Sequence, residues 1–243
     1  INAGLIIFCY SADMKKSGLK YFLLLSAVSL LPDTGNAASR YYWEKQCRKF
    51  MEENPAEVVV SYNFGKLNYD LTLSSAQIKE KSAHSVFQTR SGGKYMGLTL
   101  LNQYNNYAVT DSGAIEMGDG YYCTIPAKIE IKTGYLNPTV YLAKSMEKGT
   151  CLFRKTVRHE QQHLDIAHIF LRRYAKELEQ RVPKIIKETG PLVSLSKDSD
   201  KSLLKTYKTK IDAIYNFYFD EWREMSDKLD TLENYEKESL LCR

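Results

Sequence analysis

Hydrophobic and polar positions change their spacing twice along this chain. Over residues 39–54, apolar side chains recur at helical intervals, which predicts a helix. From residue 57 to residue 143, short β-branched and aromatic runs alternate with turns containing glycine, aspartate or proline, a pattern typical of strands. From residue 151 onward the helical spacing returns. Strands followed by long helices predict an α+β fold.

The strand-rich half is predicted to form antiparallel sheet from several short strands. We expect residues 68–73 to pair with the strand at 57–64, and a short helix around 77–81 in an otherwise polar, ambiguous stretch. The strand at 139–143 is either an ordinary sheet strand or an edge strand that pairs with an extended peptide substrate. Further strands are expected at 96–101, 107–110, 121–125 and 128–132.

Two long helical stretches follow the strands. The first covers residues 151–182 and is expected to end or kink at Pro183, because proline lacks the backbone N–H and clashes with the preceding turn. Residues 190–200 are predicted to form a loop. The second stretch covers residues 201–241 with at most one break, and its aromatic stripe is interpreted as helix–helix core.

The N-terminal residues have the pattern of a secretory signal rather than of a folded domain. Residues 14–38 contain three lysines, an apolar run over 21–31, and small residues at a cleavage site. The apolar run is shorter than the roughly 20 residues that span a bilayer. We therefore predict a secreted or periplasmic protein with no stable membrane anchor after cleavage, residues 1–13 as a gene-model extension, and one domain over 39–243. A short N-terminal anchor helix is the alternative.

Cysteine usage fits that location. Removal of the signal segment discards Cys9 and leaves four cysteines, an even number that suits disulfide bonding in an oxidising compartment. Four cysteines allow three pairings. The preferred prediction is Cys123 with Cys151 and Cys47 with Cys242, and free buried thiols are the alternative.

Composition and charge narrow the class of protein only slightly. The 243 residues are 44% hydrophobic and 26% charged, which excludes a collagen-like or largely disordered chain. The net charge is +5, the basic residues are spread along the chain, and no nucleic-acid-binding motif is present. We therefore expect no nucleic-acid partner.

The sequence His159-Glu160-Gln161-Gln162-His163 is the main chemical signal, because it is an HExxH motif within a helical pattern. Positions four apart lie on one helix face, so both histidines can direct a ring nitrogen to one zinc ion at about 2.0 to 2.1 Å. Glu160 is rotated away from His159 by about 100° and can act as general base toward a water that the metal activates. These residues predict a zinc-dependent peptidase.

A catalytic zinc site needs a third protein ligand. His168 and Asp165 point away from the two histidines on a continuous helix, so we expect them to pack or to hydrogen-bond elsewhere. His84 remains a candidate in an ambiguous region. A carboxylate from the second helical stretch, packed antiparallel against the first, is the remaining source, and periodicity does not choose among the candidates. These are Glu221, Glu224, Glu233, Glu236 and Glu238.

The segment HEQQHLDIAHIFLRRYAKEL resembles the active helix of a family of predicted secreted zinc-dependent proteases, domain of unknown function 922. The strand-rich segment with Gly97-Leu98-Thr99 and the C-terminal Tyr235-Glu236-Lys237-Glu238-Ser239 extend the likeness, although Gln162 and Glu236 replace a glycine and an aspartate of the family pattern. The resemblance implies His159 and His163 as metal ligands and Glu160 as general base. It also implies Glu238 as the first choice for third ligand, with Glu236 next.

Two function classes follow from these residues. The first is a secreted zinc metallopeptidase acting on a peptide or protein substrate, with Tyr235 as a phenol that donates to the developing oxyanion. A structural role is the alternative for Tyr235. The second class is a non-catalytic zinc-binding or envelope interaction protein on a degenerate peptidase scaffold. A fourth protein ligand closing the site would favour this second class.

Overall fold

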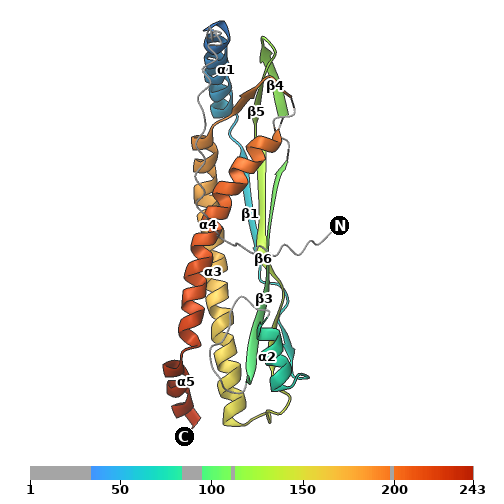
Figure 1. The fold of residues 1–243 in the computed structure, drawn as a ribbon, viewed down its shortest axis with the longest axis vertical. Helices are drawn as coiled ribbons and strands as arrows, with labels where there is room; N and C mark the ends of the chain where they lie inside the picture. Colours follow the sequence, from blue (N-terminus) through green and yellow to red (C-terminus); the bar gives the residue numbers. More distant parts are fainter. Residues whose placement is uncertain (1–33, 84–94, 111–112, 198–199, 243) are drawn as a thin grey trace, which may run out of the picture. The chain divides into compact units, whose positions relative to one another are not determined.

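Strand β6 (Lys128–Leu142) is the centre of the main sheet in the computed structural model, which describes residues 34–83, 95–110, 113–197 and 200–242. Strand β3 (Gly97–Thr110) pairs antiparallel with β6 along nearly its whole length. Strands β1 (Glu57–Asn63) and β2 (Asn68–Asp70) pair with β6 in parallel. The stretches of β6 that pair with β1 and β2 also pair with β3. Strands β1 and β2 therefore follow one another along the edge of β6 opposite to β3 (Figure 1). The outer edge of β3 pairs with no other strand in the described ranges.

A smaller antiparallel sheet lies at one end of β6. It consists of β4 (Gly113–Gly118), β5 (Tyr121–Ile125) and β7 (Leu192–Ser194) in the order β4-β5-β7. Helix α1 (Thr34–Glu53) is attached to this sheet by a disulfide between Cys47 and Cys123. Residues 35–243 belong to one compact unit.

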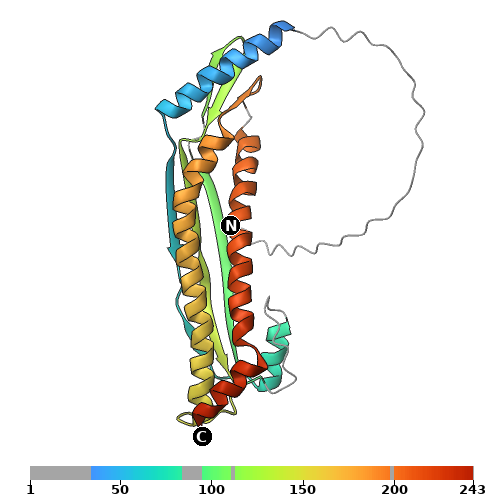
Figure 2. The same cartoon turned by 90° about the vertical axis from the view of Figure 1, so that its left-hand side faces the viewer.

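The two long helices form an antiparallel pair beside the main sheet (Figure 2). Helix α3 covers Cys151–Thr189 and α4 covers Asp200–Leu229, followed by α5 (Leu232–Ser239) and the 3₁₀ helix η1 (Leu240–Cys242). Their antiparallel register is defined by side-chain contacts at both ends and in the middle. These contacts are Lys210 with Thr189, Arg173 with Glu221, and His163 with Asp230.

Helix α3 begins at a polar cap and buries one face. The side chain of Thr150 accepts a hydrogen bond from the backbone N–H of Phe153, which satisfies a free donor of the first turn. Tyr174, Leu171 and Leu178 on the buried face are no more than 1% exposed. These side chains pack in one core with β6 and α4, so burial of apolar surface holds the helix against the sheet. The short helix α2 (Ser75–Ala83) packs into a second cluster near the start of α3 through Ile78.

The α+β class is confirmed, with strands mainly in the first half and long helices in the second. The sheet is mixed rather than wholly antiparallel, because β1 and β2 both pair with β6 in parallel. Residues 68–70 pair with β6 and not, as expected, with the preceding strand. The strand expected at 139–143 belongs to the central strand, which has partners on both sides, so it is not an edge strand.

Helix α3 continues through Pro183 to Thr189. Val182 and Ile185 are buried on either side of the proline, and their packing offsets the hydrogen bond that the ring removes. The predicted loop at 190–200 contains strand β7, and the expected break in the second helical stretch lies at Asp230 and Thr231.

The predicted cysteine pairing was wrong. The disulfides join Cys47 to Cys123 and Cys151 to Cys242. Cys123 precedes β6 and Cys151 follows it, and a 15-residue strand spans about 50 Å at about 3.3 Å per residue. The long central strand therefore separates the two cysteines that local sequence order would pair. No helix among the described residues is long and apolar enough to cross a membrane.

Candidate metal centre

His159, His163 and Asp230 form a partly buried group that could hold a metal ion. The two histidines lie one turn apart on α3. Nε2 of His159 is 3.1 Å from Oδ1 of Asp230, and Nε2 of His163 is 3.3 Å from the same oxygen. The candidate ligand atoms of the three residues all lie within 4.8 Å of one another.

The helical hairpin brings Asp230 to the histidines. Asp230 is the first residue after α4, directly before Thr231, which caps α5 by accepting a hydrogen bond from the N–H of Asn234. The antiparallel register of α3 and α4 places this break opposite the first turns of α3. Asp230 was not among the carboxylates proposed from the sequence. Its position in the one break of the second helical stretch was the signal that could have drawn attention to it.

Glu238, the first choice for third ligand, lies on the other side of the His159 ring. Its oxygens Oε1 and Oε2 are 3.4 Å and 3.3 Å from Nδ1 of His159, the nitrogen that faces away from Asp230. Glu238 is 8% exposed and is the one residue of α5 that is buried. A carboxylate at this nitrogen orients an imidazole and raises its basicity toward a metal at the opposite nitrogen.

The remaining sequence candidates for third ligand lie outside the metal-binding group. Glu236 is exposed, although it is only two residues from Glu238, because α5 turns successive side chains by about 100°. The other three form ion pairs with neighbouring basic residues. These pairs are Glu221 with Arg173, Glu224 with Lys228, and Glu233 with Lys237.

Tyr235 on α5 lies against the same histidine. Its ring stacks on that of His159 at a centroid distance of 4.9 Å, and its hydroxyl donates to Oδ1 of Asp230 at 2.8 Å. The hydroxyl is also 3.3 Å from Nε2 of His159. The phenol is therefore beside the group of metal-binding atoms. Burial and the charge of Asp230 raise its pKa well above the ordinary value, so it is a proton donor at neutral pH.

Glu160 is buried between α3 and the edge strand β3. Its Oε2 accepts a 2.7 Å hydrogen bond from the hydroxyl of Thr99. Its Oε1 lies so close to Gly97 that a Cβ at that position would collide with it. Two residues on one face of β3 thus hold the carboxylate in place, and the absence of a side chain at Gly97 makes the room for it.

The carboxyl groups and imidazoles of the site shift one another's pKa values. Burial raises the pKa of Glu160, and the two histidines oppose that rise. Burial likewise acts against ionisation of Asp230, but hydrogen bonds from His159 and His163 outweigh it and hold the pKa of Asp230 well below the usual range. Burial would lower the pKa of His159, yet the hydrogen bond to Asp230 and the charges of Glu160 and Glu238 raise it overall. Three carboxyl groups and two imidazoles thus share one partly buried space, and a cation there would compensate the charge of Asp230.

The other histidines and Asp165 lie elsewhere. His168 packs its ring against Phe64 at a centroid distance of 4.0 Å, as its helical position predicts. Asp165 is exposed and accepts a hydrogen bond from Gln161. His84 lies outside the described residues.

Comparison with known proteins adds no relative. No family model matches the chain, and neither does any curated protein or solved structure. The likeness to the predicted secreted protease family therefore stays a prediction.

Proposed function

We propose that this protein is a zinc-dependent peptidase whose metal is held by His159, His163 and Asp230. The observation that carries the proposal is the position of Glu160. The HExxH motif supplies two ligand histidines on one helix face, and its glutamate is held beside them by a separate strand rather than being a ligand itself. Metal-assisted hydrolysis needs both, ligands that hold the metal and a separate base that accepts a proton from water.

The residues fit zinc in donor type, and the separations between Asp230 and the two histidines fit it in length. Two imidazole nitrogens and a carboxylate oxygen form one of the common ligand sets of catalytic zinc. Bonds of about 2.0 to 2.1 Å in a tetrahedron place neighbouring ligand atoms about 3.3 Å apart. The separations of 3.1 Å and 3.3 Å between Asp230 and the two histidine nitrogens agree with that value. When bound, zinc would supply Lewis-acid polarisation of a carbonyl and lower the pKa of water.

Side chains of the protein would supply proton transfer, stabilisation of the oxyanion and orientation of a ligand. Glu160, held by the hydroxyl of Thr99, takes the proton from the attacking water. Tyr235, whose phenol is protonated at neutral pH, donates a hydrogen bond to the developing oxyanion. Glu238 orients His159 through Nδ1.

The edge strand β3 supports a peptide as substrate. Its outer backbone edge is unpaired by any strand in the part of the chain that the structure describes, and an extended peptide can add to such an edge through main-chain hydrogen bonds. Thr99 on the same strand contacts Glu160. A peptide paired with this end of β3 would therefore run beside the general base.

The proposed location is extracellular or periplasmic. Two disulfides are typical of proteins that fold in an oxidising compartment. Labelling of thiols in protein taken directly from each cell fraction tests this. We expect alkylation to modify none of these four cysteines, and full alkylation in freshly isolated protein would contradict the proposal.

Metal analysis and a single substitution test the function. Purified protein should contain stoichiometric zinc and cleave a peptide library. Glu160→Gln should keep the zinc and lose about 10²- to 10⁴-fold in hydrolysis, the usual contribution of a general base. Glu179→Gln, an exposed glutamate on the same helix, is the matched control and should be unaffected.

Two results would overturn the peptidase proposal. One is equal hydrolysis by Glu160→Gln and the unmodified protein. The other is stoichiometric zinc without cleavage of any peptide in the library. The second result would favour a non-catalytic zinc-binding protein on a peptidase-like scaffold.

A further inference from the structure

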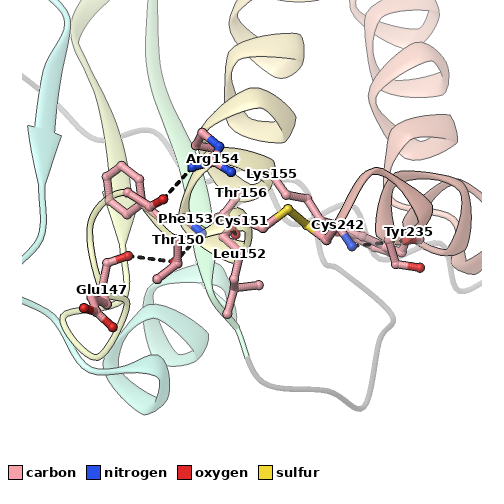
Figure 3. Close-up of a disulfide and its surroundings, with 12 residues drawn as sticks. Glu147, Thr150, Cys151, Leu152, Phe153, Arg154, Lys155, Thr156, Tyr235 and Cys242 are labelled. Carbon is pink, nitrogen blue, oxygen red and sulfur yellow. Dashed lines mark hydrogen bonds between the residues drawn. A yellow bond between two sulfur atoms is a disulfide. The ribbon is translucent and has the colours of Figure 1, made fainter.

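We propose that the disulfide Cys151–Cys242 is a redox switch that holds one wall of the metal centre in place. This inference rests on the proposed zinc site, because it concerns regulation of that site. The wall is helix α5, which carries Tyr235 and Glu238. Figure 3 shows the disulfide joining the first turn of α3 to the C-terminal segment beside Tyr235.

The hydrophobic core does not hold α5. Glu238 is its one buried residue, and none of its side chains belongs to either core cluster of the described residues. Its apolar residue Leu232 is 72% exposed, and Leu240 in the following turn is 55% exposed. Burial of apolar surface is the main force that docks a helix, and here it contributes little.

Polar contacts at the metal centre attach α5 instead. Lys155 donates from Nζ to the backbone carbonyl of Tyr235 at 3.2 Å, a bond drawn in Figure 3. The remaining attachments are the stacking of Tyr235 on His159, its hydrogen bond to Asp230, and the contact of Glu238 with Nδ1 of His159. The contacts to α3 all involve its first nine residues.

The disulfide links the C-terminal end of this segment to α3. At its N-terminal end α5 follows α4 after only Asp230 and Thr231. At its C-terminal end Cys242 is bonded to Cys151, the first residue of α3. Breaking this bond leaves the eight-residue helix joined to the described core through its N-terminal connection and the polar contacts alone. An isolated helix of this length is marginal in water, so we expect the segment to detach and fray.

Accessibility distinguishes this disulfide from the other one. Cys242 is exposed and Cys151 is half-buried, whereas Cys47 and Cys123 are both 0% exposed. Thiol–disulfide exchange requires a thiolate to reach a sulfur. A soluble reductant should therefore open Cys151–Cys242 first.

The chemical step is an exchange with a dithiol reductant. One thiolate of the dithiol attacks the sulfur of Cys242, forms a mixed disulfide and releases the Cys151 thiolate. The second thiolate of the dithiol then attacks the reductant's sulfur in that mixed disulfide. This releases the Cys242 thiolate, and the reductant leaves as a cyclic disulfide. Two electrons pass to the protein, and the two cysteine thiolates take up protons from water according to their pKa.

Opening the disulfide should weaken metal binding without removing the ligands. His159 and His163 remain on α3, and Asp230 remains attached to α4. His159 loses the carboxylate at Nδ1, and Asp230 loses the hydrogen bond from Tyr235. Loss of such outer partners typically lowers metal affinity by about 10- to 100-fold.

Zinc titration of the whole chain in three redox states tests the switch. Oxidised protein, protein reduced with low concentrations of dithiothreitol and then freed of it by anaerobic desalting, and reoxidised protein are compared. The desalting is needed because dithiothreitol itself binds zinc. Mass spectrometry of alkylated cysteines identifies which bond is open. We expect zinc affinity to fall about 10- to 100-fold when Cys151–Cys242 alone is reduced, and to recover on reoxidation. The double variant Cys151→Ser/Cys242→Ser should reproduce the fall, and Cys47→Ser/Cys123→Ser is the matched control that should not.

Hydrogen exchange provides a readout independent of the metal. Amides of α5 should lose protection on reduction while those in the middle of α3 keep theirs. Unchanged protection of α5, or zinc affinity of the reduced protein within twofold of the oxidised value, overturns the switch. Absence of zinc binding by the oxidised protein overturns the proposed metal centre instead, and is recognised because it occurs whatever the state of the disulfide.

Discussion

Nδ1 of His159 lies 3.3 Å from Oε2 of the buried Glu238, on the opposite side of the ring from the nitrogen that faces Asp230. The imidazole is therefore held between two carboxylates. Only one of them can share a metal with Nε2, so the geometry separates the role of ligand from that of orienting partner. The assignment of Asp230 as ligand and Glu238 as partner leads to quantitative expectations.

Substituting a carboxylate should lower zinc affinity more for the ligand Asp230 than for Glu238, which lies behind His159. Asp230→Asn removes a charged ligand, so we expect zinc affinity to fall by more than 100-fold. Glu238→Gln should cost about 10- to 100-fold, as outer partners of ligand histidines do. Competition with a chelator measures both. Glu236→Gln, an exposed neighbour on α5, is the control. A larger loss for Glu238→Gln than for Asp230→Asn would reverse the two assignments.

The hydroxyl of Thr99 should matter for hydrolysis rather than for metal binding. Thr99→Val keeps the shape of the side chain but removes the donor to Glu160, leaving a buried carboxylate oxygen without that partner. We expect kcat to fall at least tenfold with zinc content unchanged, and Thr99→Ser to restore most of the activity.

Thr139→Val is the control for that experiment. Thr139 lies on the adjacent strand β6, and its hydroxyl bonds to the carbonyl of Asn137 instead. Equal kcat values for Thr99→Val and Thr139→Val would show that Thr99 does not position the base.

The stability of the domain should depend on the buried face of α3. Leu171 is 0% exposed in the main core, so Leu171→Ala should lower the free energy of unfolding by about 2 to 5 kcal/mol. Ile169, two residues earlier, is 48% exposed, and Ile169→Ala should cost clearly less. Urea denaturation followed by circular dichroism measures both. Similar losses for the two variants would mean that the core is not where the structure places it.

Alkaline pH should destabilise the folded chain through its buried tyrosines. Burial raises the pKa of both Tyr107 and Tyr207 from 10.0 to about 12. The folded state thus holds these protons more tightly than the unfolded state, and the folding stability they provide is present below pH 10 and lost as pH rises toward 12.

Urea denaturation at a series of alkaline pH values tests this, with absorbance of tyrosinate recorded in parallel. We expect the free energy of unfolding to decline above pH 10 and the slope to be smaller in Tyr207→Phe. A free energy of unfolding that is constant up to pH 11, with all tyrosines titrating in one step near their ordinary pKa, is the contrary outcome.

Much of the fold could be predicted because its elements have local causes. The spacing of apolar residues located both long helices, and β-branched runs located β1, β5 and the two halves of β6. The joining of those two halves into one long strand could not be predicted. Residues 133–138 contain Gly134 and Pro138, which favour a turn locally. Pairing with β3 on both sides carries the strand through this stretch, with an irregularity at Asn137 and Pro138, where Asn137 has a φ of 48°.

The disulfides and the third ligand were likewise predicted in kind from the sequence, but not in the residues that form them. Cysteine number predicted bonding, but the length of β6 decided which cysteines meet. Several glutamates on the second helical stretch were equivalent by periodicity, while the register of α3 against α4 selected Asp230. Sequence spacing describes one element at a time, and these choices depend on how two elements are aligned.

The sequence alone therefore determined the α+β class, the long helices, and the placement of His159 and His163 on one helix face, because all three follow from local periodicity. Only the tertiary structure decided that Asp230 faces those histidines, that Glu238 lies behind one of them, and that Thr99 of the edge strand holds Glu160. Those contacts join residues 61 to 79 positions apart. Their formation depends on packing of the whole chain, which no local pattern encodes.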